Sequence, residues 1–100
     1  MSDTINLVHL RLKQDKTAAE WLKVNEKINL WVKKQPGFRF RSLSETDDGV
    51  WIVMSYWESL EAANAAEQCF GAEMMSLCEP LIVKDSIAMS QSKAHVMQRA

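Results

Sequence analysis

Hydrophobic residues occupy both alternating sets of positions between Val50 and Trp57. One set is Val50, Ile52, Met54 and Tyr56, and the other is Trp51, Val53, Ser55 and Trp57. Successive side chains of a strand point to opposite faces of the sheet, so this pattern predicts a strand that is covered on both faces. A chain of 100 residues is too short to supply two covers, and we expect a second copy of the chain to supply one of them.

The stretch before this strand predicts another strand and a helix. Residues 5–13 alternate, with Val8 and Leu10 on one face and Leu7 and His9 on the other. Residues 17–20, Thr-Ala-Ala-Glu, fit a capping box that opens a helix to about Lys34. Residues at helical spacing form one stripe along it, and they are Trp21, Val24, Asn25, Ile28, Trp31 and Val32. The helix is expected to stop at residues 35–37, Gln-Pro-Gly.

The remaining elements are predicted by similar signals. Residues 38–43 alternate as a second strand, and the Asp-Gly pair in residues 45–49 predicts a hairpin loop. Ser59 is a good N-cap for a helix from Leu60 to about Phe70, and residues 72–78 predict a further short helical turn. Residues 81–89 predict a fourth strand. Residues 91–100 show no clear period and leave three alternatives open: a tail, a short helix, or an arm on a neighbouring subunit.

The predicted order is strand, helix, strand, strand, helix, strand. This order is typical of the ferredoxin-like fold, an α+β arrangement with a four-stranded antiparallel sheet and two helices on one face. We expect a single domain over residues 1–100, with its core in about 5–90 and a tail in 91–100, because no repeat, linker or low-complexity segment interrupts the chain.

Composition and charge exclude several function classes. The net charge is −1, so no basic surface for nucleic acid or an anionic membrane is expected. No apolar run is long enough to span a membrane. The first four residues show no signal peptide, which makes the cytoplasm the expected location. Neither the spacing of Cys69 and Cys78 nor that of His9 and His95 fits a metal site, and no metal is expected.

Two short motifs carry a resemblance to a known family. Pro36-Gly37-Phe38 follows the first helix, and Tyr56-Trp57-Glu58-Ser59 closes the third strand. With this spacing around a hairpin, residues 5–90 resemble the dimeric α+β barrel superfamily, and most closely its antibiotic-biosynthesis-monooxygenase-like branch. The resemblance implies that two sheets pack face to face in a homodimer. It also implies chemistry without a cofactor, such as that of the oxygenases of polyphenols and quinols.

The resemblance extends unevenly to the known chemistries of this superfamily. In haem-degrading members a tryptophan and a haem-ligating histidine follow the Trp-Glu-Ser motif. Those places fall near Ala66 and residues 74–76 (Met-Met-Ser) here, which supply neither a tryptophan nor a histidine, so haem degradation is not expected. The polyphenol oxygenases use an asparagine and a tryptophan one helical turn apart. Asn64 stands at the first place, whereas Gln68 replaces the second.

Several residues are candidates for a pocket that holds a flat aromatic ligand. The candidate set is His9, Trp21, Asn25, Trp31, Tyr56 and Asn64. His9 suits a general base near neutral pH, and Asn25 is the one polar residue in the apolar stripe of the first helix. The alternative for each is structural: tryptophans at helical spacing often fill a core, and a polar residue in a stripe often satisfies the backbone. Arg39 and Arg41 are either solvated strand charges or binders of a carboxylate.

Three functions are compatible with these patterns. The first is a small enzyme, a cofactor-free monooxygenase or isomerase that acts on an aromatic or polyketide-like molecule. The second is a non-enzymatic dimeric domain that binds such a ligand without chemistry. The third is RNA binding, because RNA-recognition motifs share the element order. The charge and the lack of an aromatic residue in the first strand argue against the third.

Overall fold

Strands and helices follow one another in the predicted βαββαβ order in the computed structural model, which describes residues 3–100. The elements are β1 (Thr4–Leu10), α1 (Ala18–Val32), β2 (Phe38–Glu45), β3 (Trp51–Trp57), α2 (Leu60–Glu73), α3 (Met75–Cys78), the short 3-10 helix η1 (Lys84–Ser86) and β4 (Ala88–Lys93). All strand pairs are antiparallel, and the strand order in the sheet is β2-β3-β1-β4. The expected ferredoxin-like α+β fold is therefore confirmed.

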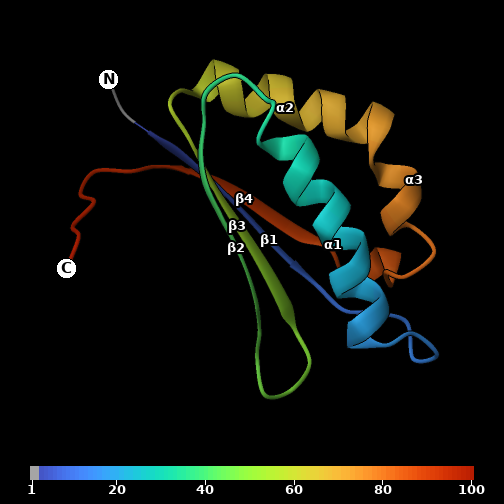
Figure 1. Ribbon diagram of the computed structural model, residues 1–100. Coiled ribbons are helices and arrows are strands. Elements are labelled where there is room, and N and C mark those ends of the chain that lie inside the picture. The colour runs from blue at the N-terminus through green and yellow to red at the C-terminus, as the bar shows by residue number, and fades with distance from the viewer. Residues whose placement is uncertain (1–2) are drawn as a thin grey trace.

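Helices α1 and α2 lie on the same face of the sheet, and within residues 3–100 no element covers the opposite face (Figure 1). The register places Val8 beside Val53 and Leu10 beside Trp51 on the helix-covered face. The opposite face, here called the open face, carries Ile5, Leu7, His9, Phe40, Ile52, Met54 and Tyr56. The helices of this chain thus cover only one of the two apolar faces of β3.

The helix that carries the apolar stripe begins where the sequence predicts it. The side-chain hydroxyl of Thr17 accepts a hydrogen bond from the backbone N–H of Glu20, and the Glu20 carboxylate accepts one from the Thr17 backbone N–H. This capping box satisfies two donors that a helix start leaves free. The stripe then buries Trp21, Asn25, Ile28 and Val32 against the sheet. Helix α1 ends at Val32, two residues before the predicted end.

The second helix starts at the predicted place and continues further than predicted. The hydroxyl of Ser59 accepts a hydrogen bond from the Ala62 backbone N–H, at 3.1 Å. Helix α2 then runs through Phe70 and Gly71 to Glu73, and α3 follows as a separate short turn. Ala63 and Ala66 are buried against Trp57 and Val32. Small side chains at these positions let α2 approach the sheet closely.

The predicted fourth strand exists, but its predicted bounds, residues 81–89, are wrong. Leu81 and Ile82 are buried in the core cluster with Leu10 and Trp21, and Ile82 forms an isolated bridge with Leu12. The strand itself is β4, at Ala88–Lys93, and all of its residues are exposed. The apolar pair Leu81–Ile82 fills the core from a loop and forms no strand of its own. The predicted tail therefore contributes residues 91–93 to the sheet, and residues 94–100 extend away from it (Figure 1).

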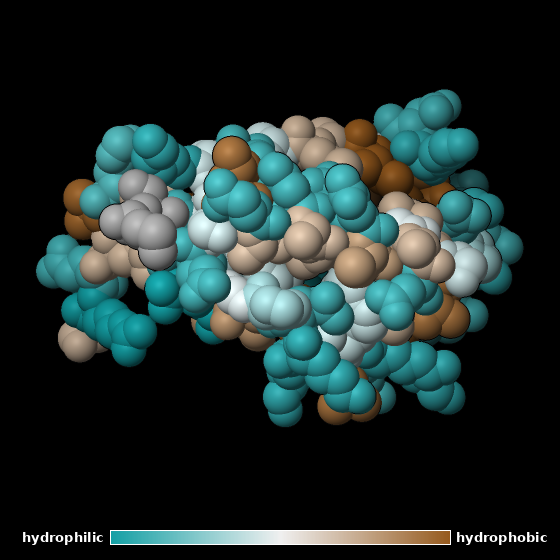
Figure 2. All heavy atoms as spheres, turned by 90° about the horizontal axis from the view of Figure 1, so that it is seen from above, coloured by the Kyte–Doolittle hydropathy of each residue, from teal (hydrophilic) through white to brown (hydrophobic). Residues whose placement is uncertain are grey.

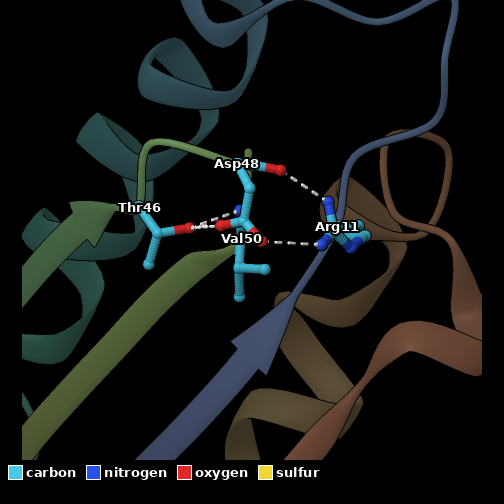
Figure 3. Close-up of polar contacts among 4 residues, drawn as sticks. All are labelled: Arg11, Thr46, Asp48 and Val50. Carbon is cyan, nitrogen blue, oxygen red and sulfur yellow. Dashed lines mark hydrogen bonds and ion pairs between the residues drawn. The ribbon is translucent and has the colours of Figure 1, made fainter.

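The loop between β2 and β3 has the predicted Asp-Gly turn. Gly49 has a φ of +85°, a conformation that glycine adopts without strain. The hydroxyl of Thr46 contacts the carboxylate of Asp48 and accepts a hydrogen bond from the Val50 backbone N–H (Figure 3). The guanidinium of Arg11, the residue after β1, also contacts Asp48. The pKa of Asp48 is lowered, chiefly by the hydrogen bond from Thr46. These exposed contacts order the hairpin and lie outside the core.

The surface over α2 differs from the open face of the sheet. Hydrophilic side chains cover most of the molecule seen from above, where α2 lies, and the hydrophobic ones form small separate groups (Figure 2). Within residues 3–100, no helix is both long and apolar enough to cross a membrane.

Candidate functional site

A cavity of about 370 Å³ lies between the sheet and the helices. Most of its lining is apolar and comes from α1, α2, α3 and the helix-covered face of the sheet. Aromatic and aliphatic members of the lining include Val8, Trp21, Trp31, Val53, Phe70 and Met75. This volume is within the range of small-molecule sites, roughly 300–1,000 Å³.

The rim of the cavity lies between α2 and β4. Four of the lining residues are exposed. Glu67 and Gly71 belong to α2, Met89 belongs to β4, and Ile87 directly precedes β4. Deeper lining residues such as Trp21 and Cys78 are buried. A ligand that enters here would pass between the last helix turns and the edge strand.

Arg41 on β2 is the one cation in the lining, among the residues that the structure describes. Its Nη1 donates to Oδ1 of Asn29 and its Nη2 donates to Oδ1 of Asn25, both at 2.7 Å. Burial lowers the pKa of Arg41, but a guanidinium starts from so high a pKa that it stays charged at neutral pH. The two asparagines therefore hold a positive charge at the edge of an apolar cavity.

Asn25 is held in place by its other side-chain atom. Its Nδ2 donates to the backbone carbonyl of Trp21 at 2.8 Å, one helical turn earlier. This hydrogen bond directs the amide oxygen toward Arg41, since the two atoms of the amide point apart. Asn25 is only 3% exposed. It satisfies a backbone carbonyl, which is the structural alternative considered from the sequence, and it also supports Arg41 in the cavity lining.

Cys78 lies at the inner part of the same cavity. Burial raises the pKa of the Cys78 thiol to about 11, while the positive charge of Arg41 opposes that rise. At neutral pH the thiol is therefore protonated and uncharged. It is neither a general base nor a counter-ion for Arg41. Among the described lining residues Glu67 is the only carboxylate, and it lies at the rim.

Two tryptophans predicted for the pocket do line it, and their ring nitrogens differ. Nε1 of Trp31 donates to a carboxylate oxygen of Glu73 at 3.2 Å, and the Trp31 ring contacts Phe70 edge to face. Nε1 of Trp21 is buried and has no hydrogen-bond partner among residues 3–100. A buried donor without a partner costs about 1–3 kcal/mol, so Trp21 leaves a donor to be satisfied.

The other candidates lie apart from this cavity. His9 and Tyr56 are on the open face, where His9 pairs with Ile52 in the register and the Tyr56 ring contacts Phe40 edge to face. Asn64 is exposed on α2 and accepts a hydrogen bond from Gln91. The structure therefore places Trp21 and Trp31 in the lining and Asn25 behind it, in contact with Arg41, and leaves out His9, Tyr56 and Asn64.

Arg41 could be only partly identified from the sequence. Arg39 and Arg41 alternate with phenylalanines in the same way, but a register shift between Phe38 and Phe40 separates the two arginines. Arg39 is exposed and pairs with Asp3 at 3.1 Å, whereas Arg41 turns toward α1. The one available signal was the pair Asn25 and Asn29, one turn apart on the helix before β2.

A protein-built metal centre has no candidate in the chain from residue 3 onward, because no three His, Cys, Asp or Glu side chains come together there.

Several solved structures have a fold similar to that of this chain. No protein-family model matches the sequence, and no curated protein matches it either. SnoaB, a cofactor-independent oxygenase from Streptomyces nogalater, is 15% identical with a TM-score of 0.81 over 97% of each chain. NE2512, a protein of unknown function from Nitrosomonas europaea, is 12% identical with a TM-score of 0.81, over 100% of this chain and 96% of that one.

A third similar structure was solved with a ligand. It is a monooxygenase from the gene ActVA-Orf6 of Streptomyces coelicolor in complex with nanaomycin D, 17% identical with a TM-score of 0.71, over 99% of this chain and 93% of that one. At these identities the comparison establishes the fold and leaves the activity open. The resemblance predicted from the two motifs is confirmed at this level: the chain has the fold of the antibiotic-biosynthesis-monooxygenase-like proteins.

Proposed function

We propose that this chain binds an aromatic or polyketide-like small molecule in the cavity and oxidises it with molecular oxygen, without a cofactor. The observation that carries the proposal is the apolar cavity of about 370 Å³, whose described lining includes Trp21, Trp31 and Phe70 and a single anchored cation, Arg41. Flat aromatic surfaces favour flat ligands through stacking and edge contacts. The shared fold with a cofactor-independent oxygenase supports the oxidation step.

The residues of the cavity suit a substrate that supplies its own electrons. A phenol or enol that loses its proton becomes electron-rich, and the positive charge of Arg41 stabilises the resulting oxygen anion. The proton passes to water, because Glu67, the only carboxylate in the described lining, lies at the α2–β4 rim and Arg41 lies on β2 at the opposite edge of the sheet. Attack of the adjacent carbon on molecular oxygen forms a C–O bond, and protonation of the outer oxygen gives a hydroperoxide. The O–O bond then breaks as the same carbon loses its remaining hydrogen, so that a carbonyl is left, one oxygen atom enters the substrate and the other leaves as water.

The apolar lining has a second role in this scheme. It excludes bulk water from the ionised substrate, and charge interactions are stronger where water is excluded. Cys78 remains a neutral thiol there and does not compete with the substrate anion for Arg41. The chain's own residues thus bind and orient the substrate and stabilise its anion.

The test measures binding and turnover separately. A polyphenol or quinol, such as a hydroxylated anthrone, is added to the purified protein, and binding is followed through the fluorescence of Trp21 and Trp31, which line the cavity. Oxygen consumption and incorporation of one labelled oxygen atom are then recorded. Binding with catalysed oxygen uptake supports the proposal. Binding without uptake would favour the second function, a ligand-binding domain, and the absence of binding would refute both.

We also propose that two copies pair through the open faces of their sheets. Ile5, Leu7, Ile52, Met54 and Tyr56 share that face, and no element of the described chain covers them. An apolar sheet face of this kind is unusual on a monomer, and a two-fold partner presents the same surface in return. The mainly hydrophilic surface over α2 gives no comparable reason for contact on that side (Figure 2). A cytoplasmic location stays a prediction.

A further inference from the structure

Two polar groups of the described cavity lining, the guanidinium of Arg41 and the indole N–H of Trp21, are hydrogen-bond donors with no anionic partner. A guanidinium has five N–H donors, and the two hydrogen bonds of Arg41 go to the neutral amide oxygens of Asn25 and Asn29. Nε1 of Trp21 is a further donor in the same lining, buried and without a partner in the described chain. Three donors of Arg41 and one of Trp21 therefore remain to be satisfied.

No carboxylate of the described chain neutralises Arg41. The ion pairs found in residues 3–100 are Arg11 with Asp48 and Arg39 with Asp3. The nearby thiol of Cys78 is protonated at neutral pH because burial raises its pKa to about 11. A partly buried charge without a counter-ion is costly unless a ligand or hydrogen bonds compensate for it.

The guanidinium of Arg41 is also held in position before any ligand arrives. Asn25 is anchored on its own helix, because its Nδ2 donates to the Trp21 backbone carbonyl, and its Oδ1 accepts from Arg41. Asn29 holds the other terminal nitrogen of Arg41 from the next turn of α1. A preorganised donor group loses little freedom on binding, which favours affinity for a matching acceptor.

We propose that Arg41, held by Asn25 and Asn29, is the receptor for an anionic oxygen of the ligand, so that the cavity selects aromatic molecules that carry a carboxylate or an ionised phenol or enol. This inference rests on the proposed function, since it assigns the ligand class of the same cavity. It adds that the acidic oxygen lies at the β2 and α1 side, with the aromatic body against the wall that Trp31 and Phe70 form together.

The test compares two probes of one shape and different charge. 2-Naphthoate and 2-naphthamide are titrated into the protein at pH 7 by calorimetry. The wild type is expected to bind the naphthoate at least about tenfold more tightly, because a hydrogen bond to a charged group contributes about 1.5–3 kcal/mol. The variant Arg41→Gln removes the charge and should abolish this preference while binding the naphthamide as before. Arg39→Gln, on the same strand, is the matched control and should leave both affinities unchanged.

A second variant guards against loss of the fold in Arg41→Gln. Asn29 is exposed and its Oδ1 lies 2.7 Å from Nη1 of Arg41, so Asn29→Asp places a carboxylate on the guanidinium with no change of size. It should lower the naphthoate affinity selectively. Equal weakening of both probes, or a preference that persists in Arg41→Gln or Asn29→Asp, would overturn the anion receptor and leave the apolar binding site standing. If the wild type binds neither probe, the proposed function fails as well.

Discussion

The carbonyl oxygen of Gly37 accepts a hydrogen bond from the backbone N–H of Glu58, at 2.8 Å. These residues belong to the two motifs, Pro-Gly-Phe and Trp-Glu-Ser, that carry the resemblance in the sequence. The side chains next to them also meet, because Phe38 and Trp57 pack edge to face with ring centroids 5.5 Å apart. The two motifs therefore form one contact, which joins the exit from α1 to the start of α2.

Replacing Gly37 with alanine should destabilise the protein strongly. Gly37 has a φ of +81°, and a Cβ there would lie 2.6 Å from Cβ of Ala62. The left-handed conformation costs a non-glycine residue roughly 1–2 kcal/mol, and overpacking adds about 1–3 kcal/mol. Urea denaturation measures the loss. Gly71→Ala is the matched control, because nothing lies within 4 Å of its Cβ position, and it should keep or slightly raise the stability. Equal stability of the two variants would contradict this reading.

Replacing Asn25 with leucine should lower the free energy of unfolding by about 1–3 kcal/mol, since it removes the hydrogen bonds to a buried carbonyl and to a partly buried guanidinium. The variant should also weaken binding of any aromatic ligand, because Arg41 loses one of its two supports. Thermal denaturation and fluorescence titration check the two effects. Lys27→Ala, at an exposed position of the same helix, should change the stability by no more than about 0.5 kcal/mol. If Asn25→Leu matches the wild type in both measurements, Asn25 supports neither the fold nor the site.

The proposed pairing of sheets predicts the effect of a charge on the open face. Leu7 and Met54 are direct partners in the β1–β3 register, and Met54→Glu would place a carboxylate among apolar side chains that a partner copy covers. Burial of an unpaired charge is strongly unfavourable, so this variant should sediment as a monomer where the wild type sediments as a dimer. Leu30→Glu, at a residue of α1 that is 64% exposed, should leave the dimer intact. A wild-type species of 11.4 kDa at micromolar concentration would refute the pairing.

The two thiols should differ in reactivity and in pH dependence. The variant Cys69→Ser leaves only Cys78, which should resist alkylation until the pH approaches about 11, because burial raises its pKa to that value and only the thiolate reacts. The variant Cys78→Ala leaves the exposed Cys69 and should be alkylated readily. Iodoacetamide kinetics between pH 7 and 11 measure both rates. Equal rates for the two variants would show that Cys78 is accessible and ordinary.

The same pKa has a consequence for stability, with a defined sign. An ordinary thiol has a pKa of 9.0 and that of Cys78 is about 11, so between these values the folded state retains a proton that the unfolded state loses. The contribution of Cys78 is therefore fully present below pH 9 and is lost as the pH rises toward 11. The wild type should lose stability over this interval faster than Cys78→Ala, as urea denaturation would measure.

Elements whose burial is periodic could be predicted from the sequence, and those whose burial is not periodic could not. The stripe from Trp21 to Val32 and the alternation of β3 record which side chains face the core, and both were located closely. Strand β4 has no buried residue, so its sequence contains no period to detect. The buried pair Leu81 and Ile82 imitates a strand, because a short apolar run fits a buried loop equally well.

In the site, too, residues on one helix face could be predicted together, whereas contacts between separate elements could not. Trp21, Asn25 and Trp31 share one helix face, and helical spacing predicted them together. His9 and Tyr56 were assigned to strands with the correct alternation, but a strand alone does not tell which of its faces adjoins a cavity. The environment of Arg41 depends on Asn25 and Asn29, 16 and 12 residues away, and on a register shift that its own strand sequence does not indicate.

The position of β4 affects how long a bound molecule would stay. This strand forms the sheet edge, pairs with β1 alone, and supplies Met89 to the rim of the cavity. Edge elements open locally at a far lower free-energy cost than global unfolding. Fraying of β4 would therefore widen the passage while the core clusters around Trp21 and Trp57 stay packed. The rate of ligand exchange would then follow the rate at which β4 opens locally. A change in that rate would alter the residence time of the ligand and leave the overall stability of the fold unchanged.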